Sequence, residues 1–557
     1  MKISIVLVLA GLTAVPALAQ LAPMPPTHPE PPSVFKPIDP GPATLDWPSY
    51  SYDAQRAGWN RGESILTKKT VGKLKPLWNT QLTTASKALI LATLTAPVVA
   101  GGVATAGGSR DLVFTIAMDD TLSALDAAIG VIVWQKNFPN PLTPLRPASI
   151  SCSNTEQATP TIDKAKSIIY FTTSDGMLRG AKLGDGAEAI KPTRMVQPFS
   201  RNWSLNLVDD VVYTTAARGC GGSPAQPVEF GTVAAMDVSD PAHPALSRFY
   251  TGKGRPAGPW GATGVAWGPQ GAYVSTADGP NNPGSGIYGD MVLAIRPHAW
   301  GLNDSFIPAH WKYLNARDLD FGSGGPLLFG MGKRNILATA SKESVVYLLD
   351  ADNLGGVDHM TALYQSPRLG NDTQDFQALG VWGSLATALN DKGERWLYTP
   401  MWGAPAKTGP KFPITNGDAP NGSIMAFKVV EDGGKPVLQP AWISRDLLIA
   451  SSPVVAGGVV YALQTAESAV QVPKAIFNPD GSRKPGWSSE QGAVNRIITP
   501  HSTMTLFALD ADTGKQLWSS GKVMDGNTVH FTQPVVALGK LFAVDHAGHV
   551  WAFGLKR

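Results

Sequence analysis

Cysteine is almost absent from this sequence, with two residues among 557. That count excludes a disulfide-dense scaffold and a four-cysteine zinc site, and no Cys-x-x-Cys-His motif is present to attach a c-type haem. Charge of one sign is not in excess either, because 46 Lys and Arg face 43 Asp and Glu. The net charge of +3 gives no basic field of the size that nucleic-acid binding requires.

Long hydrophobic runs are also missing beyond the N-terminus, where no stretch of 18 apolar residues occurs, so we expect no membrane span. Glycine and proline, in contrast, are abundant, with 58 and 46 residues. Such a content is too high for a helix-dominated fold, and it lacks the period of collagen. The chain is also several times longer than a domain of ~150 residues, which predicts several domains or one large repetitive domain.

The N-terminus resembles a targeting segment followed by a linker. Residues 1–19 read as a secretory signal peptide, with a charged Lys2, an apolar run over 3–12 and the small-residue site Ala17-Leu18-Ala19. A retained anchor is the alternative. Residues 20–48 form a Pro-rich N-terminal lead, for which we expect an extended, polyproline-like conformation. We therefore expect a periplasmic or secreted protein.

Export affects the interpretation of the two cysteines. Cys152 and Cys220 would lie in an oxidising compartment, where a disulfide between them can form. In the chain-entropy model, a bridge that closes so long a loop stabilises the fold by roughly 4 kcal/mol. Two separate buried thiols are the alternative, and the sequence leaves both open.

Two windows far apart in the chain match without a gap. Residues 122–134 read LSALDAAIGVIVW and residues 506–518 read LFALDADTGKQLW, with a weaker third copy at 346–353. Each window predicts a strand, a tight turn from Asp to Gly and a second strand that ends in Trp. The Asp and Gly have turn roles, and we expect Trp134 and Trp518 to pack between neighbouring units.

The end of this unit recurs eight times, at spacings of roughly 50 to 80 residues. The eight positions lie near Trp78, Trp134, Met195, Tyr250, Trp311, Tyr364, Trp442 and Trp518. The pattern predicts an all-β fold, an eight-bladed β-propeller over residues 49–557 that is closed by the N-terminal strand around Leu77-Trp78. Seven blades is the alternative. An insertion at 464–505 is expected to cap a central site or to form an inert surface loop.

The repeat behind a signal peptide resembles the pyrroloquinoline quinone (PQQ) alcohol dehydrogenases over roughly residues 46–557. Similar blades also build non-catalytic outer-membrane assembly scaffolds, so the function depends on the centre of the ring. Near the ring centre, the segment Gly261 to Gly268 is similar to the family's Gly-Gly-x-x-Trp strand. The resemblance implies that Trp267 is the floor beneath the quinone, with Trp260 as a competitor.

Three further segments match the family's metal and catalytic positions. Asp278 stands where the family has an Asn ligand to calcium, and Asp320 in Asp318-Leu-Asp320-Phe-Gly322 matches the catalytic base and metal neighbour. Asp318 is the alternative base. Gly322 stands where lanthanide-dependent members carry an extra Asp, which implies Ca²⁺. Lys342 aligns with the basic residue that contacts the quinone.

Three departures from the family pattern concern the remaining site residues. The adjacent cysteines of the family's disulfide lid are absent, so Cys152 is the cofactor contact only if a bridge to Cys220 serves a similar place. Arg218 occupies the region of the calcium-binding Glu, and Glu229 is the metal-ligand candidate if an insertion is allowed. No haem domain is evident, so electrons are expected to pass to an external acceptor such as a cytochrome c.

The resemblance implies a quinoprotein dehydrogenase that oxidises an alcohol by hydride transfer to PQQ, with Ca²⁺ as Lewis acid and Asp320 as general base. The short Asp-x-Asp-Phe-Gly pattern is closer to the polyvinyl-alcohol dehydrogenase branch than to methanol dehydrogenases. The alternative function is a non-catalytic propeller that serves as a scaffold or binding module. The sequence does not indicate which alcohol is the substrate.

Overall fold

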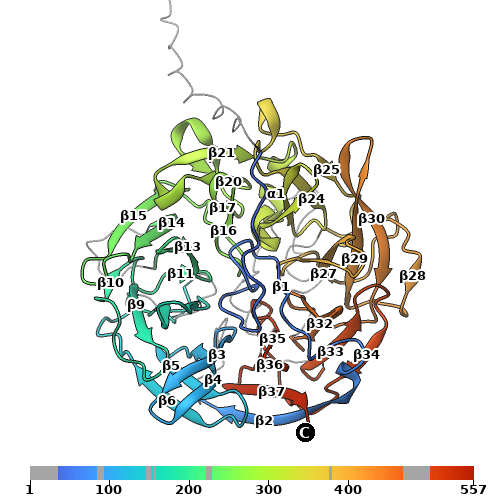
Figure 1. The fold of residues 1–557 in the computed structure, drawn as a ribbon. Coiled ribbons are helices and arrows are strands. Elements are labelled where there is room, and N and C mark those ends of the chain that lie inside the picture. The colour runs from blue at the N-terminus through green and yellow to red at the C-terminus, as the bar shows by residue number, and fades with distance from the viewer. Residues whose placement is uncertain are drawn as a thin grey trace, which may run out of the picture.

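The computed structural model describes residues 35–83, 93–145, 148, 152–155, 158–220, 229–374, 379–467 and 502–556. These residues form an eight-bladed β-propeller, in which antiparallel sheets surround a central axis (Figure 1). The predicted fold class and blade number are therefore confirmed. Among the described residues, no helix is both long enough and apolar enough to cross a bilayer.

The blades follow one another in chain order, and the first four use residues 98–306. Blade 1 contains β3 (Val98–Thr105), β4 (Gly108–Ile116), β5 (Thr121–Asp126) and β6 (Ile132–Asn137). Blade 2 contains β7 (Thr161–Asp163), β8 (Ile168–Thr172), β9 (Met177–Lys182) and β10 (Thr193–Arg194). Blade 3 contains β11 (Arg201–Asn202), β12 (Asn206–Val208), β13 (Val211–Arg218), β14 (Phe230–Asp237) and β15 (Ala245–Tyr250). Blade 4 contains β16 (Ala266–Gly268), β17 (Gly271–Ser275), β20 (Val292–Ile295) and β21 (Leu302–Phe306), with the small ribbon β18 (Asn281–Asn282) and β19 (Ile287–Tyr288) beside it.

The second half of the ring uses the rest of the chain. Blade 5 contains β22 (Leu327–Met331), β23 (Arg334–Ala340), β24 (Val346–Asp350) and β25 (Tyr364–Gln365). Blade 6 contains β26 (Ala386–Leu389), β27 (Arg395–Trp402), β28 (Ile414–Thr415), β29 (Gly422–Asp432) and β30 (Lys435–Ile443). Blade 7 contains β31 (Val454–Ala456), β32 (Val459–Gln464), β33 (Thr505–Asp510) and β34 (Gln516–Ser519), with β1 (Trp59–Asn60) along its inner edge. Blade 8 contains β35 (Val535–Ala537), β36 (Lys540–Val544), β37 (His549–Leu555) and β2 (Leu74–Gln81).

Helices are few and short. The α-helix α1 spans Trp311–Arg317, between blades 4 and 5. The 3-10 turns are η1 (Val71–Lys73), η2 (Pro283–Ser285), η3 (Pro297–Ala299), η4 (Phe321–Gly324) and η5 (Gly356–Asp358). One predicted strand end is corrected here, because Trp311 begins α1, whereas the outer strand of blade 4 ends at Phe306.

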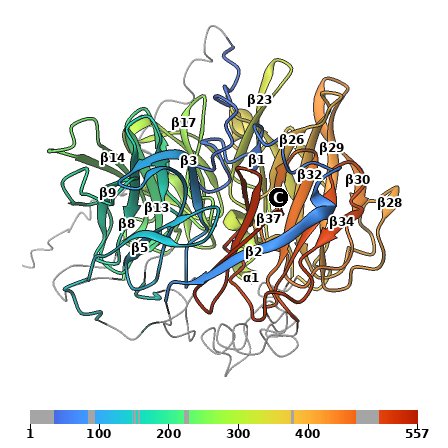
Figure 2. The ribbon, with the colours of Figure 1, turned by 60° about the horizontal axis from the view of Figure 1, so that its bottom comes forward.

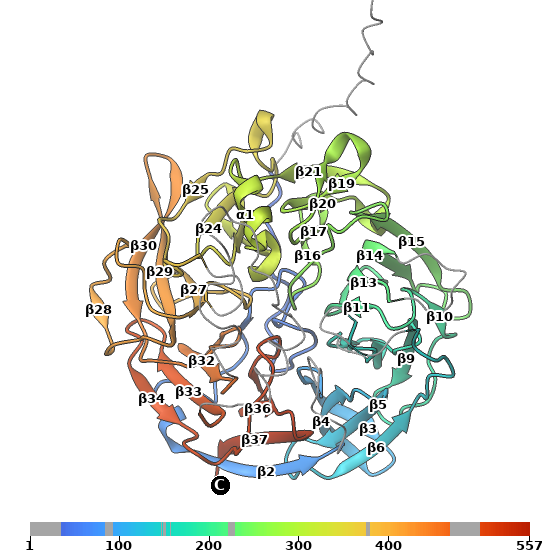
Figure 3. The same cartoon turned by 180° about the vertical axis from the view of Figure 1, so that it is seen from behind.

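The ring closes between the two ends of the chain, as predicted. Strand β2 pairs antiparallel with β37, in a register that joins Leu74 to Leu555 and Gln81 to His549. Blade 8 therefore takes its outer strand from the N-terminal region, and the blue β2 lies along the red β37 (Figure 3). The pairing completes the four strands of blade 8 and joins the two ends of the described chain.

The repeated Trp residues join successive blades. The indole Nε1 of Trp78 in blade 8 donates to Ala127 O in blade 1 (3.2 Å), and that of Trp134 in blade 1 donates to Leu183 O in blade 2 (2.8 Å). Trp518 in blade 7 donates in the same way to the Leu74 carbonyl at the start of β2 (3.0 Å). Gly130 is needed for the Trp78 contact, because a Cβ at position 130 would lie 2.5 Å from the ring of Trp78.

The central channel is filled by an N-terminal segment, residues 47–60, which we call the plug (Figure 1). The plug makes a hydrogen bond or β-bridge with the innermost strand of every blade. Its partners in blades 1 to 8 are Val99, Ile162, Asn206, Trp267, Leu328, Thr387, Val455 and Val536. A single short segment therefore links all eight blades at one level of the channel.

A buried arginine fixes the plug. Arg56 is fully buried and donates to the carbonyl oxygens of Val265 (2.8 Å), Leu205 (2.8 Å) and Tyr50 (2.7 Å). It also reaches the Ser49 hydroxyl at 3.4 Å. Because these acceptors belong to the plug and to blades 3 and 4, Arg56 ties the two together by charge-assisted hydrogen bonds.

Candidate active site

The candidate site lies at the end of the channel where the innermost strand of each blade begins and its neighbouring strand ends. We call this end the site face. Asp278 follows β17, Lys342 follows β23 and Trp402 ends β27, while Trp260 and Trp382 lie shortly before β16 and β26. Figure 2 shows the ring from the side, with α1 at the lower end and the dark-blue N-terminal segment at the upper end. The repeat therefore brings equivalent positions of different blades around one axis.

Three carboxylates gather at the site face between blades 4 and 5. Asp278, Asp318 and Asp320 each offer an oxygen, and these oxygens all lie within 4.8 Å of one another. Asp318 is the left-handed C-cap of α1, with φ 56°, and Asp320 precedes η4. The backbone N–H of Asp278 donates to Asp320 Oδ1 at 3.1 Å, which fixes the distance between the two elements. The cluster offers hard oxygen ligands of the kind that Ca²⁺ prefers.

Lys342 is the cation of this cluster. Its Nζ lies 2.5 Å from Asp320 Oδ2 and 3.2 Å from Asp318 Oδ1, and the side chains of Lys342 and Asp320 are each only 4% exposed. The same Nζ stands 4.3 Å from the ring centroid of Trp382, a cation–π contact. One cation thus faces three carboxylates, which leaves a net negative site.

The charge imbalance shifts the titration of the cluster. Burial, and then the charges of Asp318 and Asp320, raise the pKa of Asp278 well above its usual range. Burial alone would lower the pKa of Lys342, but Asp318 and Asp320 offset it, and the net pKa is raised. The cluster therefore holds Lys342 protonated and has electrostatic room for a further cation.

Aromatic and cationic groups from blades 3, 4 and 8 form one wall of the site. The Trp260 ring meets Trp203 edge to face, with centroids 5.2 Å apart, and Phe531 lies 5.1 Å from Trp203. The Arg201 guanidinium lies over Trp260, 4.2 Å from its ring centroid. The indole Nε1 of Trp260 is buried and has no hydrogen-bond acceptor among the described residues. Such a donor is the kind of group that a bound ligand can satisfy.

A second aromatic group comes from blade 6 and from the loops beside it. Trp382 and Trp402 stack with centroids 5.0 Å apart and planes at 2°. His530 meets both rings edge to face, and its Nδ1 makes a buried hydrogen bond with Glu467 Oε2 at 2.7 Å. The insertion predicted at 464–505 starts next to Glu467, but residues 468–501 lie outside the described part of the chain.

The structure brings together Asp278, Asp320 and Lys342 of the predicted site residues. It does not bring Trp267 to them. Trp267 lies at the level of the plug, where its backbone N–H donates to Ala54 O and its ring packs on Tyr213. It pairs with Ala272, four strand residues or roughly 13 Å from Thr276. Trp260, the competitor, is on the correct side, because Pro259 bridges to Thr276, two residues before Asp278.

The other predicted residues belong to the site-face end of blade 3. Arg218 ends β13, with its guanidinium 5.0 Å from the ring centroid of Phe230. Glu229 is not part of the cluster of described carboxylates, and its backbone N–H donates to Gln197 Oε1 at 3.1 Å. The third carboxylate is instead Asp318. The site therefore holds three carboxylates although position 322 is a glycine.

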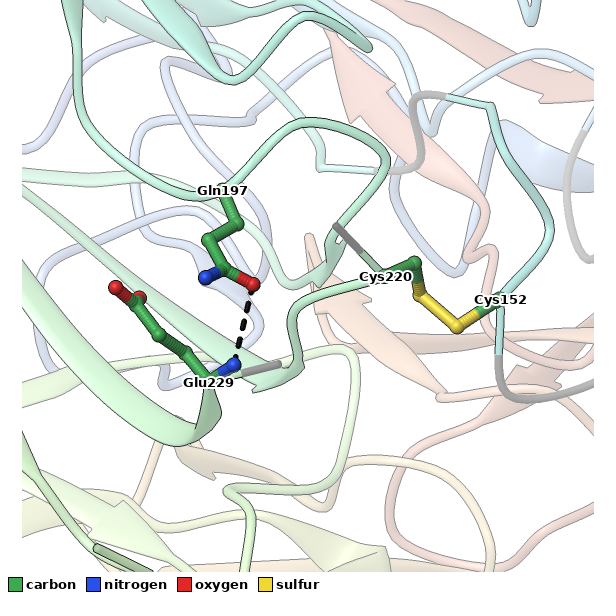
Figure 4. Close-up of a disulfide and its surroundings, with 4 residues drawn as sticks. All are labelled: Cys152, Gln197, Cys220 and Glu229. Atoms are coloured by element: carbon green, nitrogen blue, oxygen red, sulfur yellow. Dashed lines mark hydrogen bonds between the residues drawn. A yellow bond between two sulfur atoms is a disulfide. The ribbon is translucent and has the colours of Figure 1, made fainter. Parts of the chain in front are cut away.

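A disulfide joins Cys152 to Cys220, so the structure resolves the open alternative (Figure 4). The two Cα atoms are 5.7 Å apart and the residues are separated by 68 positions in the chain. Cys220 follows β13 and Cys152 lies between blades 1 and 2, so the bridge connects loops of three blades. Figure 4 shows Gln197 and Glu229 beside it.

Trp203 and Trp382 are site residues that the sequence pattern does not single out. A signal for them exists, because each stands a few residues before an innermost strand, in Asn202-Trp-Ser and Val381-Trp-Gly, and Trp260 stands likewise in Pro259-Trp-Gly. This signal can be used only when the strand boundaries are known, and the uneven spacing of the middle repeats in the sequence does not define them.

No protein-family model and no curated protein matches this sequence. Among solved structures, it is similar to a europium-containing methanol dehydrogenase, with a TM-score of 0.57 and 13% identity over 92% of this chain and 98% of the other. It is also similar to quinohemoprotein alcohol dehydrogenases from Pseudomonas putida HK5 (TM-score 0.55, 13% identity, 92% of this chain and 80% of the other) and from Comamonas testosteroni (0.55, 14%, 93% and 82%). At these identities the similarity establishes the fold alone.

Proposed function

We propose that this chain is a quinoprotein dehydrogenase that oxidises an alcohol, with PQQ and a hard metal ion bound at the site face. The observation that carries the proposal is the cluster of Asp278, Asp318 and Asp320 around Lys342. Three carboxylates with one cation are expensive to bury without a ligand. The similar structures include a methanol dehydrogenase and two quinohemoprotein alcohol dehydrogenases, which supports the same class of reaction.

The residues at the site fit both groups. The three carboxylates would hold the metal ion through oxygen ligands. PQQ is a flat tricarboxylate, and the Trp260 ring, its buried Nε1–H and the cations Arg201 and Lys342 supply an apolar plane, a donor and positive charge. When bound, PQQ supplies the oxidant that accepts hydride from the alcohol carbon.

The protein's own contribution to the reaction is to accept a proton. We assign this role to Asp320, which is 3% exposed and whose Oδ2 lies 2.5 Å from Lys342 Nζ. Deprotonation of the alcohol hydroxyl by a carboxylate in a water-poor site promotes loss of hydride from the carbon. Asp318, at 3.2 Å from Lys342, is the alternative base.

The carboxylate ligands constrain the identity of the metal ion. Gly322 favours Ca²⁺, whereas the third carboxylate also suits a trivalent ion, and one of the similar structures is described as europium-containing. We propose Ca²⁺ as the resident ion. Parallel titrations of the purified protein with Ca²⁺ and with La³⁺, followed by turnover in the presence of PQQ, test this choice. If turnover requires La³⁺, the resident ion is a lanthanide and not Ca²⁺.

We further propose that the protein is exported after cleavage following Ala19 and passes its electrons to an external acceptor such as a cytochrome c. The disulfide supports export, because such bonds persist mainly in oxidising compartments. N-terminal sequencing of the protein recovered from the periplasm or medium tests the cleavage. A mature chain that still begins at Met1 would contradict it.

Reconstitution is the decisive experiment for the function. Purified protein would receive PQQ and metal, singly and together, and dye reduction would be followed with primary, secondary and polymeric alcohols. We expect turnover only with both additions, and polymeric substrates would favour the polyvinyl-alcohol branch. If PQQ does not bind with either metal, the alternative function as a non-catalytic scaffold or binding module is favoured.

A further inference from the structure

The segment that carries two of the three carboxylates is held at both ends by one tight turn. Residues 310–320 include α1, Asp318 and Asp320. The turn lies between β23 and β24, and Ser344 N donates to Ser341 O at 2.9 Å. Its two central residues are Lys342 and Glu343. Lys342 holds the end of the segment, through its ion pairs with Asp318 and Asp320.

Glu343 holds the beginning of the same segment. His310 Nε2 lies 3.0 Å from Glu343 Oε1 and 2.9 Å from Oε2, immediately before α1. The Tyr347 hydroxyl donates to Glu343 Oε1 at 3.0 Å and fixes the carboxylate from the other side. Glu343 is 2% exposed, whereas the His310 side chain is 38% exposed. His310 is therefore the solvent-facing member of an otherwise buried contact.

The segment between these two contacts is packed as one unit. Leu314, Leu319 and Phe321 are fully buried in a single hydrophobic cluster, and Phe321 meets Tyr347 edge to face with centroids 5.1 Å apart. Because close-packed interiors transmit small displacements, a shift at His310 is expected to move Asp318 and Asp320. The His310–Glu343 contact can therefore influence the positions of Asp318 and Asp320 although His310 does not touch them.

Electrostatics couples this contact to pH. The hydrogen bond that His310 donates to Glu343 raises the pKa of His310 above its ordinary value of 6.5, while burial and the charge of Arg368, in the loop after β25, act to lower it. Tyr347 faces the same carboxylate, and burial raises its pKa, so it stays neutral. Since the pKa of His310 is higher in the folded than in the unfolded protein, the ion pair with Glu343 contributes its full stability at pH values below the unfolded-state pKa. The contribution is lost as the pH rises through the folded value.

We propose that His310 is a positioning residue which, through Glu343 and the adjoining Lys342, sets the spacing of Asp318 and Asp320 for metal binding. This inference rests on the proposed metal site. It makes metal affinity depend on a group whose described partner is Glu343 and not one of the three carboxylates.

The test compares Ca²⁺ affinity of the purified full chain and of His310→Gln by calorimetry. Glutamine retains a hydrogen-bond donor but cannot carry the charge. We expect His310→Gln to bind Ca²⁺ roughly tenfold more weakly at pH 6.5, as is usual for residues that orient metal ligands. The ratio of the two dissociation constants should fall toward one at pH 8.5. Protonation of the metal-binding carboxylates affects both proteins equally. The ratio of their dissociation constants therefore reports the contribution of His310 alone.

Two further variants separate this role from general stability. Glu343→Gln should weaken Ca²⁺ binding to a similar degree, and the double variant should be no weaker than either single one, because both changes remove the same pair. The control is His359→Phe, since His359 pairs with buried Asp304 and its side chain is 37% exposed. We expect wild-type affinity in that control. A ratio for His310→Gln that is near one at pH 6.5, or that does not change with pH, would overturn the proposal.

Hydrogen exchange distinguishes failure of this proposal from failure of the metal site. If the wild-type protein does not bind Ca²⁺, the proposed metal site is at fault, and amide protection of residues 311–320 still reports on the contact. We expect higher protection factors at pH 6.5 than at pH 8.5 in the wild type and no such difference in His310→Gln. Equal protection in both proteins at both pH values would refute the positioning role.

Discussion

The two ends of the central channel treat buried polar groups in opposite ways. At the plug, Arg56 is fully buried, and three carbonyls and a hydroxyl of the protein itself accept its hydrogen bonds. At the site face, three carboxylates crowd around one lysine, and a buried indole N–H has no acceptor among the described residues. The buried Trp47 Nε1 of the plug has no acceptor among the described residues either, so the contrast lies in charge. The charge of Arg56 is compensated by acceptors of the protein, whereas the carboxylates of the site end outnumber the lysine that faces them. The difference separates a structural end from a functional one on the same axis.

The largest expected effect is loss of turnover on changing Asp320 to Asn. Removal of a general base in such a site lowers turnover by about 10³-fold, while the fold, supported at the plug, remains. Dye-coupled turnover and thermal unfolding of the reconstituted variant measure the two quantities. Asp350→Asn is the control, because Asp350 lies at the end of β24 that is away from the site face and accepts a hydrogen bond from Asp352 N, and asparagine preserves that acceptor. Turnover within a few-fold of wild type would transfer the role of base to Asp318.

Removal of the disulfide tests how the site face is held. Replacing Cys152 and Cys220 by Ser releases a long loop, and the chain-entropy model predicts a loss of about 4 kcal/mol in the free energy of unfolding. Urea titration of the double variant measures the loss. An unchanged unfolding midpoint would mean that the hydrogen bonds of blades 1 to 3 hold these loops without the bridge.

A change at the plug should affect stability without affecting chemistry. Arg56→Leu leaves the carbonyls of Leu205 and Tyr50 buried without the Arg56 donor, at roughly 1 kcal/mol each, or about 2 kcal/mol together, while the Val265 carbonyl keeps its hydrogen bond from Asn206 Nδ2. Urea titration gives the stability, and turnover per folded molecule should stay at the wild-type level. Arg110→Leu is the control, because this partly exposed arginine pairs with Asp126 at the surface and should change stability by less than about 1 kcal/mol.

A fall in turnover of folded Arg56→Leu, as large as that expected for Asp320→Asn, would contradict the separation of the two ends. It would show that the plug positions the catalytic groups and does more than close the channel.

The sequence predicted the two ends unequally, for a physical reason. The outer hairpins repeat because the turn from Asp126 to Gly130 and the ring of Trp134 must fit the next blade, so blade number and ring closure could be inferred. Asp278, Asp320 and Lys342 could be proposed because the segments that contain them resemble the metal-binding, catalytic and quinone-contacting segments of the PQQ alcohol dehydrogenases. The sequence could not place Trp260 and Trp267 at their levels in the channel, because Trp260 stands shortly before β16 and Trp267 lies within it, and only the strand register separates the two levels. The plug has no local pattern, because its contacts depend on blades that are distant in the chain.

The smallest expected effect compares two indoles. Trp134 Nε1 donates to Leu183 O at 2.8 Å, whereas Trp260 Nε1 has no such acceptor among the described residues. Replacement of Trp by Phe removes the indole N–H and a similar ring area at both positions, but only Trp134 loses a hydrogen bond. The free energy of unfolding of Trp134→Phe should therefore be about 1 kcal/mol lower than that of Trp260→Phe. Only Trp260→Phe should weaken PQQ binding, by several-fold, as measured by fluorescence quenching. Equal stability losses together with unchanged PQQ affinity would mean that the Trp260 indole serves packing alone, and the distinction between the two ends would then rest on the carboxylates.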